Sequence, residues 1–175
     1  MRLHDEDPRR SDRNRRSAGA ESGRVSAFET SIRIRRPVED VFTFVSEPLN
    51  FARWNSAVRA VRKTSEGDSA VGSTYTMERD LPSGDARNEL EVFAREQPTE
   101  FGIRTTSGPT PFRYRYVFSA ANGETVLEID AEVEVDGPAA LLGPLVARAV
   151  RRGVDDNFAE LKRILETPAP AERTG

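Results

Sequence analysis

The chain has 175 residues, of which 37% are hydrophobic and 31% are charged, and its formal net charge is -3. This length suits one domain with a substantial core, and the small net charge gives no general attraction to nucleic acid. No stretch approaches the roughly 20 apolar residues of a membrane-spanning helix, and the polar N-terminus has no apolar signal region, so we expect a cytoplasmic protein.

The residue inventory restricts the chemistry that the chain can perform. Cysteine is absent, and the one histidine, His4, lies in the polar N-terminal segment. The folded region therefore lacks a thiol nucleophile, an imidazole base and the usual zinc ligands. Glycine-rich phosphate-binding loops are absent as well. From the missing metal ligands and the missing loops we expect no metal and no cofactor. Any catalysis would rely on Asp, Glu, Tyr, Lys, Arg or water.

Composition divides the chain into a domain and two tails. Residues 1–25 contain many Arg, Asp, Glu, Ser and Gly residues and almost no large apolar side chain, so we expect a disordered polar tail. An arginine-rich arm that binds an acidic partner or a membrane is the alternative, which the interspersed acids weaken. We predict one domain over residues 26–166 and a flexible tail over residues 167–175.

The first elements after the tail are a strand and two short helices. Alternating apolar and polar residues predict a strand over residues 28–35. Pro37 favours the start of a helix, because its fixed φ suits the first turn, and an apolar stripe follows it. A second short helix is predicted over residues 49–54, and it ends at Trp54, the only tryptophan.

Six further alternating segments predict an antiparallel meander. They cover residues 57–65, 73–80, 86–96, 99–106, 112–120 and 125–135, and turn residues such as Asn122-Gly123 separate them. The last two segments carry aromatic and aliphatic residues on one side and charges on the other, which indicates a sheet with one apolar face. We expect Arg113 and Arg115 to pair across strands with some of the acids of the last segment, which are Glu128, Asp130, Glu132 and Glu134.

The C-terminal segment predicts a long helix that covers the apolar face of the sheet. Its apolar residues recur at intervals of three or four and form one helical stripe: Leu142, Val146, Val150, Val154, Phe158, Leu161 and Leu165.

This order of elements resembles the START-like, or SRPBCC, superfamily, and most of all its polyketide cyclase/dehydrase and lipid-transport branch of mostly small bacterial proteins. The resemblance depends on residues 32–42, the turn at Trp54, residues 71–75 and residues 161–165. It implies an α+β helix-grip fold, in which a curved antiparallel sheet wraps around a long C-terminal helix, with two short helices after the first strand. It also implies a hydrophobic cavity between sheet and helix, used elsewhere in the superfamily for lipids, polyketides and hormones.

Strand parity then nominates the side chains that would line such a cavity. Arg79 follows Tyr75 and Met77 at a spacing of two, and Asn88 precedes Leu90 and Val92 in the same way. A buried guanidinium would need an anionic group beside it, so Arg79 is a candidate for recognising a carboxylate, phosphate or enolate; an exposed or salt-bridged arginine is the alternative. The candidate ligand-binding residues are Trp54, Tyr75, Met77, Arg79, Asn88, Phe101, Tyr114 and Tyr116.

A simpler interpretation is that these residues only fill a core, and it applies most strongly to Leu90, Val92 and Ile103. Asp155 and Asp156 lie midway along the predicted long helix. Adjacent helical residues point about 100° apart, so these two carboxylates cannot face each other, and solvent exposure or arginine partners explain them better than catalysis.

The leading hypothesis is a protein that binds a small hydrophobic or amphipathic molecule. An aromatase/cyclase or dehydratase-like enzyme that uses Tyr114, Tyr116 or Arg79 with water is the alternative, and a partner-binding or stress-response domain with a residual pocket is a third. No catalytic residue is assigned, and no pattern sets an oligomeric state. The alternating charges and the inward aromatics argue against a nucleic-acid partner.

Overall fold

The computed structural model describes residues 24–81, 84–135 and 143–167. The predicted tails therefore lie outside the described residues except at residues 24, 25 and 167, and so does Leu142. Arg24 and Val25 begin the first strand, where they pair with Val135 and Glu134. The elements, in order, are β1 (Arg24–Ile34), α1 (Val38–Val45), the 3-10 turn η1 (Pro48–Asn50), α2 (Phe51–Trp54), β2 (Val58–Lys63), β3 (Thr74–Leu81), β4 (Gly84–Glu96), β5 (Glu100–Ser107), β6 (Phe112–Ala121), β7 (Glu124–Val135) and α3 (Gly143–Glu166).

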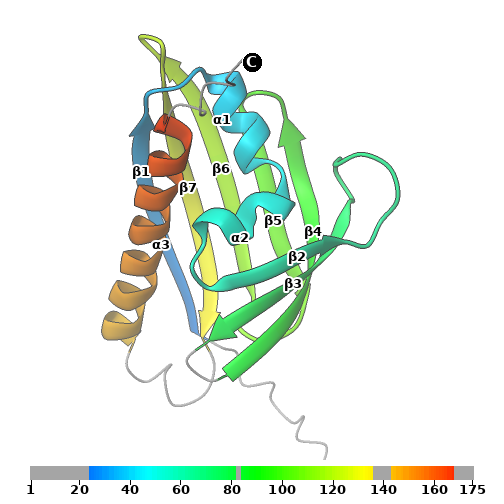
Figure 1. Ribbon diagram of the computed structural model, residues 1–175. Coiled ribbons are helices and arrows are strands. Elements are labelled where there is room, and N and C mark those ends of the chain that lie inside the picture. Colours follow the sequence, from blue (N-terminus) through cyan, green and yellow to red (C-terminus); the bar gives the residue numbers. More distant parts are fainter. Residues whose placement is uncertain (1–23, 82–83, 136–142, 168–175) are drawn as a thin grey trace, which may run out of the picture.

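The seven strands form one antiparallel sheet in the order β1-β7-β6-β5-β4-β3-β2. Strands β2 to β7 follow one another as hairpins, which confirms the predicted meander (Figure 1). The chain leaves β1 through α1, η1 and α2 before it enters β2, which confirms the two short helices after the first strand. At the β6–β7 turn, Asn122 and Gly123 have φ values of 54° and 81°, as a tight hairpin of this composition requires.

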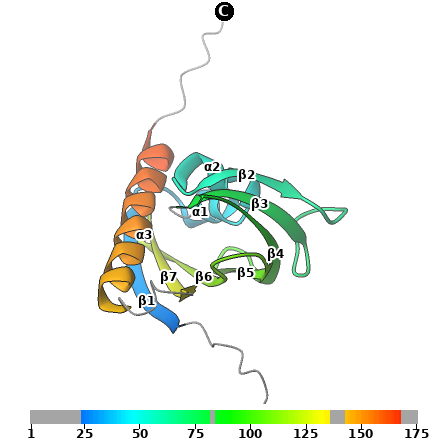
Figure 2. The ribbon, with the colours of Figure 1, turned by 90° about the horizontal axis from the view of Figure 1, so that it is seen from below.

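The sheet curls, and α3 closes its open side. Figure 2 shows β2 and β3 facing β5, β6 and β7, with α3 running beside β1. Register shifts between Glu89 and Leu90, and again between Val92 and Ala94, add bends where β4 pairs with β5. The predicted helix-grip architecture is thus confirmed.

Burial follows the predicted alternation along β6 and β7. Phe112, Tyr116 and Phe118 are buried on the concave face, while Arg113 and Arg115 are exposed on the convex face. On β7, the acids between the apolar residues are exposed. Four apolar residues of this strand are buried: Leu127, Ile129, Ala131 and Val133.

The arginines of β6 make different contacts from the ones predicted. Arg115 pairs with Glu100 of β5 at 2.7 Å rather than with an acid of β7. Arg113 lies over the ring of Phe93 on β4, 3.8 Å from its centroid. Gly102 leaves room for that ring, since a Cβ at this position would lie 2.5 Å from it. Arg113 thus lies over an aromatic ring and forms no ion pair with the β7 acids among the described residues.

Helix α3 buries its apolar stripe mainly in its C-terminal half. Phe158 and Leu161 are buried, whereas Val150 and Val154 are only half-buried. The regular spacing of the stripe does not show this gradient, because it depends on how far the helix is from β1 and α2, which it packs against.

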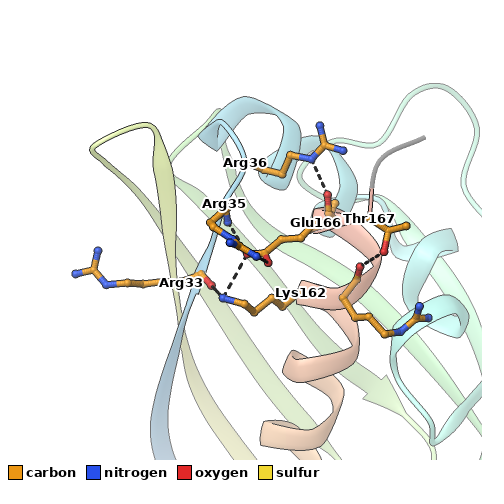
Figure 3. Close-up of polar contacts among 8 residues, drawn as sticks. Arg33, Arg35, Arg36, Lys162, Glu166 and Thr167 are labelled. Atoms are coloured by element: carbon orange, nitrogen blue, oxygen red, sulfur yellow. Dashed lines mark hydrogen bonds and ion pairs between the residues drawn. The ribbon is translucent and has the colours of Figure 1, made fainter. Parts of the chain in front are cut away.

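A cluster that we call the C-terminal clasp joins the end of α3 to the end of β1 (Figure 3). Glu166 accepts hydrogen bonds from the backbone N–H of Arg35 at 2.8 Å and from its guanidinium Nη2 at 2.9 Å. Lys162 Nζ donates to the carbonyl of Arg33 at 2.6 Å, and Arg36 Nε donates to the carbonyl of Leu165 at 2.6 Å. These bonds give partners to backbone groups at the end of β1 and to the carbonyl of Leu165 in the last turn of α3, which has no partner within the helix.

Candidate functional site

Strands β3 and β6 bring Arg79 and an aromatic group together across the concave face. These strands are separated by β5 and β4 in the sheet, so a flat sheet would hold them about 14 Å apart. Nevertheless, Arg79 Cζ lies 5.6 Å from the ring centroid of Phe112. Curvature of the sheet and the length of the arginine side chain therefore make this contact.

Arg79 is half-buried, and its guanidinium is incompletely partnered. Its Nη1 atom is buried without a hydrogen-bond partner, and no ion pair to Arg79 occurs among the described residues. Burial lowers the pKa of Arg79, and the nearby Tyr114 partly opposes that effect. An arginine pKa is high enough that the group nonetheless stays cationic at neutral pH.

Two tyrosines of β6 lie on the same face. Tyr114 stacks on Phe112 with 4.5 Å between ring centroids, and Tyr116 stacks on Phe101 with 6.0 Å. Burial raises the pKa of Tyr114, and it raises that of Tyr116 well above its ordinary value. Both phenols are therefore protonated at neutral pH, and they are suited to donating hydrogen bonds rather than to accepting protons.

Asn88 of β4 is a buried amide with one side-chain hydrogen bond among the described residues. Its side chain is fully buried, and Nδ2 donates to the carbonyl of Pro109 at 2.8 Å. The β5–β6 connection comes this close because Gly108 adopts a φ of 110°, and a Cβ there would lie 2.4 Å from the carbonyl oxygen of Arg87. The Oδ1 atom of Asn88 is buried without a partner.

Trp54 ends α2 and contributes a third such atom. The side chain is 4% exposed and packs edge-on against Phe51 at 5.5 Å, yet its Nε1 donor has no partner. The loop that follows is held to α3 by Asn157, whose Oδ1 accepts from the backbone N–H of Ser56 at 3.0 Å and whose Nδ2 donates to Asn55 at 3.1 Å.

The remaining candidates lie in the same buried cluster, but they differ in what they offer. Met77 and Phe101 are buried and apolar. The Tyr75 ring is buried too, but its hydroxyl is hydrogen-bonded to Ser69 Oγ, which in turn donates to Glu47 at 3.2 Å. Burial raises the pKa of Tyr75. Ser69 of the β2–β3 loop thus links the Tyr75 hydroxyl on β3 to Glu47, the residue before η1.

Sequence reasoning omitted two participants. Phe112, which lies against Arg79, shares the strand face of Tyr114, so its parity was a usable signal. Pro109, the partner of Asn88, lies in a loop, and no periodic pattern marks it. Asp155 and Asp156 are exposed, and Asp155 accepts a hydrogen bond from Thr30 Oγ1 at 2.8 Å, so this carboxylate joins α3 to β1.

Metal binding and membrane crossing have no structural counterpart in the described part of the chain. No group of three or more His, Asp or Glu side chains in residues 24–81, 84–135 and 143–167 is arranged to hold a metal ion. Over the same residues, no helix combines the length and apolar character needed to cross a membrane.

One hollow of about 270 Å³ lies at the edge where β5, β6 and β7 meet. Its lining is mostly charged, with Arg104, Arg113, Glu132 and Glu134 beside Phe112, and it includes none of the eight candidate residues.

Comparison with known proteins identifies the kind of protein to which this architecture belongs. A family profile described as "Polyketide cyclase / dehydrase and lipid transport" matches residues 26–166. No curated protein sequence matches the chain. Among solved structures, a START superfamily protein from Mycobacterium smegmatis is 14% identical with a TM-score of 0.69, covering 80% of this chain and 97% of that one.

Two other structures share the fold. TTHA0849 from Thermus thermophilus is 13% identical with a TM-score of 0.69, covering 79% of this chain and 96% of that one. The di-domain ARO/CYC BexL from the BE-7585A biosynthetic pathway is 19% identical with a TM-score of 0.65, covering 83% of this chain and 51% of that one. At these identities the likeness concerns the fold alone.

Proposed function

Because the chain belongs to the polyketide cyclase/dehydrase and lipid transport family, we propose that it binds a small apolar or amphipathic molecule between the concave face of the sheet and α3. The ligand would lie against Trp54, Met77, Phe101 and the β6 tyrosines. Aromatic and apolar surface of this kind suits an apolar guest, and a few polar atoms would set its orientation.

One observation carries the proposal: three of the eight candidate residues have a buried polar atom without a partner, and they come from three different elements. The atoms are Trp54 Nε1 on α2, Arg79 Nη1 on β3 and Asn88 Oδ1 on β4. A fourth such atom among the described residues, Ser46 Oγ, lies just after α1 and belongs to no candidate residue. Buried polar groups in folded proteins are nearly always paired, and each unpaired one costs about 1–3 kcal/mol. A bound molecule with polar atoms would remove these costs, which a core that only fills space would not do.

Native mass spectrometry of the purified protein tests the proposal, followed by extraction and identification of any released molecule. We expect a stoichiometric apolar passenger or, after its removal, saturable binding of long-chain probes that changes the emission of Trp54. A protein that carries no passenger and takes up no apolar probe would contradict the proposal.

The runner-up function is a cyclase or dehydratase-like reaction, and the position of Tyr114 supports it. This protonated phenol lies close enough to Arg79 for each to affect the pKa of the other. A phenol donor beside a fixed cation can stabilise negative charge that develops on a carbonyl oxygen. Turnover of a poly-β-ketone analogue that falls at least tenfold in Tyr114→Phe, with unchanged substrate affinity, would favour the enzyme over the carrier.

A further inference from the structure

The unpartnered atoms of Arg79 and Asn88 are a donor and an acceptor on neighbouring strands. In the β3–β4 register, Arg79 is opposite Ala86 and Asn88 is opposite Met77. Arg79 and Asn88 are thus diagonal neighbours on one face of the sheet, with about 7 Å between their Cα atoms. They do not bond to each other, since Nη1 and Oδ1 both lack a partner.

Each of the two atoms can play only one role. Guanidinium nitrogens donate and cannot accept hydrogen bonds. The amide of Asn88 is oriented by its Nδ2 bond to the carbonyl of Pro109 at 2.8 Å, so Oδ1 is left as an acceptor. A group that binds here must therefore offer an acceptor toward Arg79 and a donor toward Asn88.

Charge restricts the group further. Arg79 forms no ion pair with the described residues; the ring of Phe112 lies 5.6 Å from its Cζ atom, and the nearby Tyr114 is neutral as well. Arg79 is half-buried and lacks a counterion, so an anionic acceptor at its buried Nη1 fits this position better than a neutral one. A planar carboxylate matches the guanidinium geometry.

We infer, on the basis of the proposed function, that the ligand is an amphipathic hydroxy acid. Its carboxylate accepts a hydrogen bond from Arg79 Nη1, and a hydroxyl two or three carbons away donates to Asn88 Oδ1. Its apolar part lies along Phe101 and Tyr116. A simple fatty acid would leave Asn88 Oδ1 unpaired, and an ester or an alcohol would leave the cation of Arg79 unbalanced.

A series of three probes separates these contributions: 3-hydroxydodecanoate, dodecanoate and methyl 3-hydroxydodecanoate, titrated at pH 7.5 and followed by Trp54 emission and calorimetry. We expect the hydroxy acid to bind about tenfold more tightly than either of the other two, as one recovered buried hydrogen bond or one charge pair would give. Arg79→Gln should remove the preference over the ester and keep the preference over dodecanoate. Asn88→Ala should remove the preference over dodecanoate and keep the preference over the ester.

Arg62→Gln is the matched control, because Arg62 lies on the adjacent strand β2 with its side chain 76% exposed, and it should change no affinity. The Arg79→Gln result and the wild-type probe series test the inference even where Asn88→Ala does not fold. Equal affinity for all three probes would refute the inference that the ligand is a hydroxy acid, but not the proposed binding function. Dodecyl phosphate that binds as tightly as the hydroxy acid would have the same consequence. A copurified passenger that lacks the carboxylate or the hydroxyl also overturns the inference. Absence of any passenger and of any apolar binding refutes the proposed function itself.

Discussion

The C-terminal clasp makes the stability of the protein dependent on Glu166, and replacing Glu166 with Gln tests this directly. The substitution keeps the size of the side chain and one acceptor oxygen but removes the charge. Hydrogen bonds from the guanidinium and the backbone N–H of Arg35 lower the pKa of Glu166 to about 2, and Lys162 adds a smaller effect, while desolvation opposes it.

The size of the effect follows from that pKa. A fall from the ordinary value of 4.5 to about 2 would correspond to about 3 kcal/mol if none of the interaction were screened. The Arg35 side chain is 72% exposed, however, and exposed pairs contribute much less. We therefore expect Glu166→Gln to lower the free energy of unfolding by about 1 kcal/mol at pH 7.

The pH dependence has a definite sign. Because folding lowers the pKa of Glu166, its stabilisation is fully present above about pH 4.5 and is lost as the pH falls through about 2. The difference between wild type and Glu166→Gln should shrink over the same range. Urea unfolding followed by the emission of Trp54, which is 4% exposed in the native state, measures this difference at each pH.

Glu160→Gln is the control for the clasp, because Glu160 pairs with Arg163 at 2.6 Å within one helical turn and bonds to no other element in the part of the chain that the structure describes. We expect its unfolding transition to stay close to that of the wild type at pH 7. The reasoning is wrong if Glu166→Gln unfolds together with the wild type at pH 7, or if its deficit is the same at pH 2 as at pH 7.

Three further substitutions test local features of the fold, each by urea unfolding. Gly108→Ala should lower the free energy of unfolding by about 2 kcal/mol, because φ is 110° and the added Cβ would collide with backbone; an unchanged midpoint would contradict this. Gly153→Ala should raise the free energy of unfolding by about 0.5–1 kcal/mol, because the position lies inside α3 and no atom lies within 4 Å of the added Cβ. A lower free energy of unfolding would contradict this. Asn157→Ala should cost about 1–3 kcal/mol through the lost bonds to Ser56 and Asn55, whereas a neutral result would mean that water replaces them.

The candidate site shows how far sequence patterns extend. Alternation in β3 and β4 assigns Arg79 to the face of Met77, and Asn88 to the face of Leu90, since side chains two apart in a strand share a face. The alternation does not show that these two side chains have unpartnered atoms, nor that Arg79 contacts Phe112. Phe112 is separated from Arg79 by two intervening strands, and they become neighbours through the curvature of the sheet and the length of the arginine side chain.

The sequence by itself determined the order of the strands and helices, the meander and the inward face of each strand, because period-two and period-3.6 patterns and turn residues act over a few residues. Tertiary structure decided which half of α3 is buried, how Arg113 and Arg115 are partnered, and that Arg35 meets Glu166 across 131 positions of chain. These outcomes depend on curvature, register and the docking of α3, which arise from all the packed elements together.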